Sequence, residues 1–303
     1  MKVRTESASD PRDSTGKRFE SAVGRRRFLA GATAAATLAG LPARSPAAAQ
    51  VKMKRKIPIG LQLYAVREEF ARSVPETLKT VARCGYAGVE FWGYAGTASV
   101  FQHYTAQQLR QLLDENKLKC CGIHLQVKAL EAAQLERTIE NNRILGNRFL
   151  VVAAAKKEMS SLASIKAFAA FLNEAHEKCR AHQMRVGYHA HGFDFEKLEG
   201  RFAWDHLFSQ TRPEVIMQMD IANCLGGGGD PLAMLEKFPG RALSLHIRET
   251  GEKIFASDYY REVFRLAEST AKTEWYVVEQ GGPGGKGFAV SEQALQALNR
   301  LGK

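Results

Sequence analysis

The amino-acid sequence predicts one α/β domain folded as a (β/α)8 barrel. Between Ile57 and the carboxyl terminus, eight short apolar segments alternate with helical segments at a spacing of roughly thirty residues. The apolar segments are nearly continuous, as expected for strands of a parallel sheet that is buried on both faces. The length of this part, about 250 residues, is typical of one such barrel.

Each repeat begins with an expected strand. In order, the strands are Ile59–Tyr64, Gly88–Trp92, Lys119–Leu125, Arg148–Ala153, Arg185–Ala190, Val215–Asp220, Ala242–Ile247 and Trp275–Glu279. The helices that follow them carry apolar residues at helical spacing. They are expected at Val74–Cys84, Thr105–Asn116, Ala129–Leu145, Ser161–His182, Ala203–Ser209, Leu232–Lys237, Tyr259–Glu268 and Ser291–Leu301. Pro75 fits the start of the first helix, because the first turn leaves backbone amides unused.

Residues 1–49 are predicted to be an export signal that is removed from the mature protein. Three arginines at positions 25–27 precede an Ala/Gly/Thr/Leu run, and Ala47 and Ala49 occupy the small-residue positions before Gln50. The paired arginines indicate the twin-arginine route and a periplasmic or exported protein. The alternative is an uncleaved membrane anchor, but the apolar run is short and rich in Ala and Gly. We expect no stable membrane insertion after cleavage.

The chain thus divides into residues 1–49, a polar linker at residues 50–56 and the barrel at residues 57–303, which shows no internal break in composition. Residues 1–49 hold nine of the 43 basic and four of the 32 acidic residues, so without them the net charge falls from +11 to +6. The remaining charge is mild and no Lys/Arg cluster is spaced like a nucleic-acid footprint, which excludes nucleic acid as the expected partner. The five cysteines show no Cys-x-x-Cys spacing and predict no disulfide framework.

The stretch Val215–Glu249 carries the strongest functional signal. It predicts a strand, a glycine-rich loop, a short helix and a second strand, with Asp220 at the end of the first strand and His246 at the end of the second. The carboxyl ends of parallel barrel strands share one edge, where such barrels place their chemistry. The alternative reading is a solvated aspartate and a buried, hydrogen-bonded histidine.

Other polar residues also lie at expected strand ends, and together they are Glu90, His124, His189, His191, Asp220, His246 and Glu279. Four of these residues come from consecutive strands and can converge above the barrel axis: His189, Asp220, His246 and Glu279. Two imidazoles and two carboxylates suit one divalent ion, Mn²⁺, Zn²⁺, Co²⁺ or Fe²⁺, and do not select among them. For Glu90 a salt-bridged carboxylate, and for His124 a structural hydrogen bond, remain open alternatives.

Several motifs resemble the sugar phosphate isomerase/epimerase family, the xylose-isomerase-like TIM barrels. They are LQLYAVRE (61–68), GYAGVEFWG (85–93), GYHAHGFDFE (187–196), GGDP (228–231), LSLHIRE (243–249) and WYVVEQ (275–280). The family's usual metal ligands are Glu, Asp, His and Glu from late strands, and the resemblance assigns the last three to Asp220, His246 and Glu279. His189 stands where the first carboxylate is expected, in a His-x-His motif that also resembles inosose dehydratase-like members.

The resemblance and the ligand set together predict a metal-dependent enzyme that removes a proton next to the carbonyl of a sugar or keto-sugar. In such chemistry the cation polarises the carbonyl and stabilises an enediolate, while a side chain takes the proton. Glu279 is the expected base, with His124 and His191 as further catalytic candidates. The expected substrate contacts come from Glu90, Arg248 and Trp92, although packing at the barrel mouth is the commoner role of such a tryptophan.

Three alternatives stay open at this point. A lyase or dehydratase would expel a β-substituent from an oxidised sugar or inosose after the same proton abstraction. A non-catalytic carbohydrate-binding barrel would need no base. A DNA-repair endonuclease of related fold would need more metal ligands and a basic groove, and the export signal argues against it. The expected partner is a small carbohydrate; its identity, its phosphorylation and the oligomeric state are not predicted.

Overall fold

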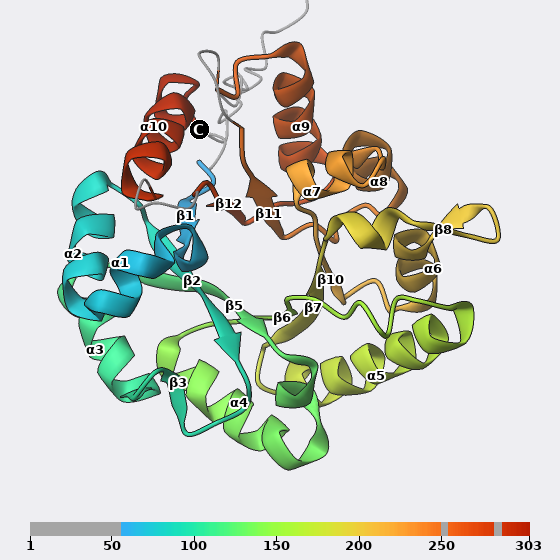
Figure 1. The fold of residues 1–303 in the computed structure, drawn as a ribbon, viewed down its shortest axis with the longest axis horizontal. Coiled ribbons are helices and arrows are strands. Elements are labelled where there is room, and N and C mark those ends of the chain that lie inside the picture. Colours follow the sequence, from blue (N-terminus) through green and yellow to red (C-terminus); the bar gives the residue numbers. More distant parts are fainter. Residues whose placement is uncertain (1–55, 250–253, 282–286) are drawn as a thin grey trace, which may run out of the picture. The chain divides into compact units, whose positions relative to one another are not determined.

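The computed structural model describes residues 56–249, 254–281 and 287–303, and Figure 1 shows the chain with its helices arranged outside the strands. Eight parallel strands lie in the spatial order β10-β7-β6-β5-β2-β1-β12-β11. They are β1 (Ile59–Gln62), β2 (Gly88–Tyr94), β5 (Lys119–Leu125), β6 (Phe149–Val152), β7 (Arg185–His189), β10 (Ile216–Gln218), β11 (Ser244–Ile247) and β12 (Trp275–Val278). The predicted (β/α)8 barrel, in a single domain, is confirmed.

The barrel closes between β10 and β11, the two outer strands of this order. An isolated parallel bridge joins Asp220 and His246, and the amide of His246 donates a hydrogen bond to the carbonyl of Met219 at 2.8 Å. The closure therefore brings the two residues that the sequence singles out next to one another.

Ten α-helices lie among the described residues, and several of them begin at a side-chain cap. They are α1 (Arg67–Arg72), α2 (Val74–Cys84), α3 (Ala106–Glu115), α4 (Ala132–Leu145), α5 (Leu162–Arg180), α6 (Ala203–Gln210), α7 (Ile221–Gly226), α8 (Pro231–Lys237), α9 (Asp258–Ser269) and α10 (Gly287–Arg300). At α2, the Ser73 hydroxyl accepts a hydrogen bond from the amide of Glu76, and Gly85 ends the helix with a φ of 101°. All eight predicted helices are present, with small shifts at their ends.

The structure differs from the sequence prediction in the connections that surround the carboxyl ends of the strands. The first strand stops at Gln62, whose side chain accepts a hydrogen bond from the amide of Tyr64 at 3.1 Å and turns Leu63–Val66 into a 3₁₀ helix. A short helix, α7, lies between Asp220 and the predicted glycine-rich loop at Gly226–Gly229, and the carboxylate of Asp220 caps its start by accepting a hydrogen bond from the amide of Asn223 at 2.7 Å. Two short hairpins are also new: β3 (Ser99–Phe101) with β4 (Tyr104–Thr105), and β8 (Lys197–Leu198) with β9 (Arg201–Phe202).

The barrel interior has an apolar layer and a polar layer. Phe149, Val151, Ile216 and Leu243 form a small separate cluster, with Trp275 packed against it. Nearer the carboxyl ends of the strands, the buried residues are polar: Gln62, Glu90, His124, His189, Gln218, Ser244 and His246. Gly122 on β5 leaves room for this polar layer, because a Cβ there would lie 2.3 Å from a carboxylate oxygen of Glu90.

A cavity of about 1040 Å³ opens at the amino-terminal ends of the strands. It is lined among others by Arg110, Lys119 and Trp275, and none of the predicted metal ligands lines it.

Within residues 56–249, 254–281 and 287–303, no helix is long and apolar enough to cross a bilayer. The predicted export signal (residues 1–49) and all but the last residue of the predicted linker lie outside the described residues.

Candidate metal centre

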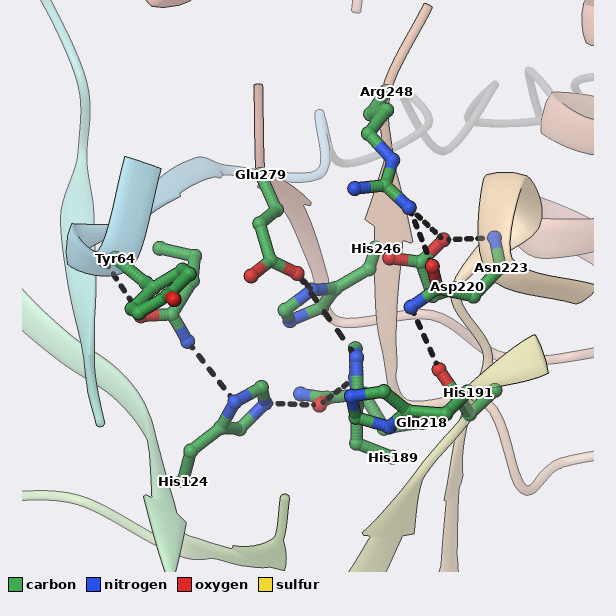
Figure 2. Close-up of polar contacts among 12 residues, drawn as sticks. Tyr64, His124, His189, His191, Gln218, Asp220, Asn223, His246, Arg248 and Glu279 are labelled. Atoms are coloured by element: carbon green, nitrogen blue, oxygen red, sulfur yellow. Dashed lines mark hydrogen bonds and ion pairs between the residues drawn. The ribbon is translucent and has the colours of Figure 1, made fainter. Parts of the chain in front are cut away.

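The four predicted ligands converge at the carboxyl ends of neighbouring strands (Figure 2). His189 is the last residue of β7, Asp220 follows β10, His246 lies in β11 and Glu279 directly follows β12. Each offers one ligand atom, and these four atoms lie within 4.8 Å of one another. His246 Nδ1 lies 3.0 Å from Glu279 Oε2, and His189 Nε2 lies 4.0 Å from the same oxygen.

Asp220 provides a direct test of whether a cation fits this cluster. Its Oδ1 accepts a hydrogen bond from the amide of Asn223 and lies 3.9 Å from the guanidinium of Arg248. Its Oδ2 is buried and lacks a hydrogen-bond partner within the described part of the chain. A buried carboxylate oxygen without a partner is costly, and a divalent cation would satisfy it. The oxygen and nitrogen donors therefore fit a borderline or hard divalent ion.

Two hydrogen bonds behind the histidines leave one nitrogen of each ring facing the cluster. His189 Nδ1 lies 2.9 Å from Gln218 Oε1, so Nε2 faces Glu279. His246 Nε2 lies 2.7 Å from Glu90 Oε2, so Nδ1 faces Glu279. This is the arrangement in which a ligating histidine is oriented by a hydrogen-bond acceptor on its other nitrogen.

His124 lies in the same cluster but is engaged on both ring nitrogens. His124, His189 and His246 also have nitrogens within 4.8 Å of one another, so a three-histidine site is geometrically conceivable. However, His124 Nε2 lies 2.7 Å from Gln218 Oε1, and its Nδ1 lies 3.3 Å from the amide nitrogen of Gln62. With both nitrogens hydrogen-bonded, His124 is the weaker candidate ligand.

Charges in the cluster are strongly coupled. Burial opposes ionisation of Glu90, but His124 and His246 outweigh it and lower the pKa of this carboxyl to about 2. Burial also disfavours a charged His246, yet the carboxylates of Glu90 and Glu279 raise the pKa of its ring to about 10. Burial and the nearby Glu279 raise the pKa of Asp220 to about 6. A divalent cation would therefore compete with a proton on His246, and the affinity for that cation would depend on pH.

The predicted substrate contacts occupy three different environments. Glu90 is fully buried behind His246, a position that favours support of the histidine over contact with a substrate. Trp92 is partly buried in an aromatic cluster, with ring centroids 5.7 Å from Tyr64 and 4.9 Å from Phe101. The side chain of Arg248 is 39% exposed and donates a hydrogen bond to Asn223, beside Asp220.

His191, a predicted catalytic residue, borders the cluster without joining it. Its ring centroid lies 5.0 Å from that of His189, and its ring stacks on Phe193 at 5.4 Å. Its Nδ1 is buried and has no hydrogen-bond partner among the described residues. The backbone amide of His191 donates to Asp194 at 2.7 Å, which fixes this loop.

Sequence reasoning missed the two buried glutamines and the exposed tyrosine of this site. Gln62 and Gln218 are both fully buried, and each contacts Glu90 and His124. A polar residue inside an otherwise apolar strand was the available signal, and Gln218 lies two residues before Asp220. Tyr64, 46% exposed just after β1, is one of few exposed large apolar side chains among the described residues.

Comparison with solved structures shows what the fold resembles. The chain is similar to a sugar phosphate isomerase/epimerase from Parabacteroides distasonis, with 21% sequence identity, a TM-score of 0.68 and coverage of 84% of this chain and 98% of that chain. It is also similar to an AP endonuclease, family 2, from Brucella melitensis, with 17% sequence identity and a TM-score of 0.59; the match covers 80% of this chain and 99% of that chain. A third similar structure is a probable 3-DHS dehydratase from Bacillus anthracis, with 14% sequence identity and a TM-score of 0.59; the match covers 80% of this chain and 99% of that chain.

At these identities the similarity to solved structures establishes the fold alone. No match was found among curated proteins. The family model of the xylose isomerase-like TIM barrel matches residues 78–301, which is most of the chain and contains all four converging ligands. The chain therefore belongs to the xylose isomerase-like TIM barrel family.

Proposed function

We propose that the protein is a divalent-metal-dependent enzyme that removes a proton next to the carbonyl of a sugar or keto-sugar, as isomerases and epimerases do. The observation that carries this proposal is the buried Oδ2 of Asp220, which has no hydrogen-bond partner in the described part of the chain and lies in a cluster of four possible metal ligands. His189, Asp220, His246 and Glu279 would hold the ion. When bound, it would polarise a substrate carbonyl and stabilise the negative charge that develops as the proton leaves.

Glu279 is the residue best placed to take the proton. Its hydrogen bond with His246 outweighs burial and lowers the pKa of its carboxyl, so the carboxylate form that a base requires is present at neutral pH. Its side chain is 18% exposed, whereas that of Glu90 is completely buried. Glu279 can therefore reach a substrate from the open side of the site.

A lyase or dehydratase is the second candidate, and His189 favours it. Two-base epimerisation needs a second acid/base group on the opposite face of the reacting carbon, and the strand-five position that carries a carboxylate in the resembling family is an imidazole here. Of the neighbouring histidines, His191 has a ring nitrogen, Nδ1, that lacks a hydrogen-bond partner among the described residues. In the elimination branch it would donate a proton to the leaving group.

The mouth of the site offers contacts for a small carbohydrate. Arg248 presents a partly exposed guanidinium beside Asp220 (Figure 2), and Tyr64, two residues after the end of β1, presents an exposed ring. A cation that can bind hydroxyls and a ring that can stack on a sugar face form a suitable pair. Membership of the xylose isomerase-like TIM barrel family supports a small carbohydrate as the substrate.

The proposal is tested by following solvent deuterium into candidate substrates. The protein, supplied with Mn²⁺ or Zn²⁺, is incubated in D₂O with a panel of sugars and 3-keto-glycosides, and NMR is recorded after the metal is chelated. We expect deuterium, or an eliminated product, at the carbon next to the carbonyl, and no exchange by protein that was stripped of metal. Binding of a sugar in calorimetry without exchange or turnover would instead favour the non-catalytic carbohydrate-binding barrel.

Metal content gives an independent measurement. Elemental analysis should find about one divalent ion per chain, and Asp220→Ala or His246→Ala should lose most of it, because each removes a ligand. Asp230→Ala is a matched control, since Asp230 caps α8 through the amides of Leu232 and Ala233 and contacts none of the four ligands. Full occupancy in both ligand variants would contradict the metal centre.

We also propose export through the twin-arginine route. Protein recovered from the periplasm should lack residues 1–49, and replacing Arg25 and Arg26 by lysine should stop export. Mature protein that begins at Met1 would contradict this assignment. An exported location makes an unphosphorylated or oxidised sugar the more suitable substrate.

A further inference from the structure

Gln218 is the centre of the hydrogen-bond network behind the candidate metal centre. Its Oε1 lies 2.9 Å from His189 Nδ1 and 2.7 Å from His124 Nε2. Its Nε2 lies 2.8 Å from Glu90 Oε1 and 3.0 Å from the hydroxyl of Ser244. The side chain is fully buried, so all its hydrogen-bonding capacity is used inside the protein.

The direction of each of these hydrogen bonds follows from Glu90. A carboxylate only accepts, so the atom of Gln218 that faces Glu90 must be the NH₂ group. The amide oxygen of Gln218 therefore faces the two histidines, and the histidine nitrogens that meet it must carry hydrogen. For His189 this places the proton on Nδ1 and leaves the lone pair of Nε2 toward Glu279.

Gln62 fixes the same direction independently. Its Oε1 accepts a hydrogen bond from the backbone amide of Tyr64, and a backbone amide only donates. Its NH₂ group is therefore the end that faces Glu90 at 2.8 Å and His124 Nδ1 at 3.3 Å. His124 must then accept at Nδ1 and donate from Nε2 to Gln218, in agreement with the orientation set by Glu90.

We propose that Gln218, oriented by the buried carboxylate of Glu90, is a positioning residue that holds His189 in the tautomer whose Nε2 can bind the metal. The inference rests on the proposed metal centre. Glu90 holds the other histidine ligand directly, through Nε2 of His246, so one buried carboxylate orients both rings. Removal of an acceptor behind a ligating histidine typically weakens metal affinity about 10–100-fold.

A charge swap between positions 90 and 218 tests the direction of the network. Gln218→Glu places two carboxylates at the 2.8 Å contact, and Glu90→Gln places two amide groups there, so each single variant loses that hydrogen bond or turns an amide. In the double variant Glu90→Gln/Gln218→Glu, the new amide can donate to the new carboxylate. That carboxylate still accepts from His189 and His124, and the amide oxygen at position 90 still accepts from His246 and Gln62.

Affinity for Mn²⁺ and for Zn²⁺ is measured by calorimetry on the full, metal-stripped chain. We expect each single variant to weaken binding about 10–100-fold and the double variant to recover most of that loss. Asn147→Leu is the matched control. This buried amide, at the opposite end of the barrel, also makes several hydrogen bonds, so its loss should cost stability and leave metal affinity unchanged. A double variant no better than the sum of the two single variants would overturn the proposal.

A second measurement needs no variant and no metal. In ¹⁵N NMR spectra of the metal-stripped wild-type protein, His189 should carry its proton on Nδ1 and His124 on Nε2. A proton on Nε2 of His189 would overturn the role of Gln218 even if every variant failed to fold. If the wild type bound neither ion, the proposed function would fail, while the ring tautomers would still decide the role of Gln218.

Discussion

The two layers of the barrel interior show how one set of strands performs two tasks. On β10, Ile216 belongs to the apolar cluster near the amino-terminal ends of the strands, and Gln218, two residues later, belongs to the polar layer. On neighbouring β7, Gly187 and His189 pair with them in register. The apolar layer gains stability from burial, at about 25 cal/mol per Å² of apolar surface.

The polar layer gains little net stability from its hydrogen bonds, about 1 kcal/mol each, but leaving a partner unsatisfied is costly. This layer instead fixes the direction of its hydrogen bonds, because a carboxylate only accepts and a backbone amide only donates, and these directions determine the ring tautomers of the histidines. The comparison therefore predicts that changes in the apolar layer alter stability, whereas changes in the polar layer and above it alter metal binding and chemistry.

The largest expected effect is on the rate of proton exchange and comes from Glu279, which contacts His246 of the polar layer. Glu279→Gln keeps the shape of the side chain and one oxygen donor but removes the base, so solvent exchange at the substrate carbon should fall about 10²–10⁴-fold with metal resupplied. The measurement is the rate of deuterium entry, with thermal unfolding recorded in parallel. Glu249→Gln is the control, since that carboxylate contacts the backbone of Phe255 and not the histidines. Wild-type exchange in Glu279→Gln would make Glu279 a ligand only and move the search for the base to His124 or His191.

The next effect is on stability and lies in the apolar layer. Ile216→Ala leaves a cavity among Phe149, Val151 and Leu243, and the free energy of unfolding should fall by about 2–5 kcal/mol. Metal affinity should stay within about threefold of wild type, because no hydrogen bond of Gln218 is removed. Denaturant unfolding and calorimetry together check both parts. A loss of metal affinity as large as that expected for Gln218→Glu would contradict the separate roles of the apolar and polar layers.

The smallest effect concerns a carboxyl group buried outside the polar layer. Asp194 accepts hydrogen bonds from the Tyr188 hydroxyl at 2.8 Å and the His191 amide at 2.7 Å. Burial raises the pKa of Asp194 to about 7, whereas the histidines around equally buried Glu90 lower its pKa to about 2. Neighbouring groups, and not burial by itself, therefore decide in which direction the pKa of a buried acid shifts.

The raised pKa of Asp194 makes stability depend on pH in a defined direction. The folded protein holds this proton between about pH 4 and pH 7 while the unfolded chain has lost it, so the contribution to stability is fully present below pH 4 and declines as pH rises to 7. Asp194→Asn should remove this decline, with a difference on the order of 2 kcal/mol between pH 4 and pH 8. Identical pH profiles for wild type and variant in denaturant unfolding would contradict a neutral, buried Asp194.

The sequence by itself determined the barrel and the positions of its polar strand ends. Apolar segments such as Val215–Asp220 mark strands, and parallel strands in a barrel present their carboxyl ends on one side. It followed that His189, Asp220, His246 and Glu279 could converge, and the structure does bring them together. These inferences depend on local patterns and on one topological rule, which is why they could be made without coordinates.

The tertiary structure alone decided which atoms face one another. Glu90, His124 and Gln218 come from strands far apart in sequence, and only their packing shows that Glu90 is enclosed by donors and that both nitrogens of His124 are engaged. The short helix α7, before the predicted glycine-rich loop at Gly226–Gly229, was also missed, because its start depends on the side chain of Asp220 capping the amide of Asn223. Hydrogen-bond direction and pKa depend on several non-local neighbours at distances of about 3 Å, and no spacing along the chain encodes those distances.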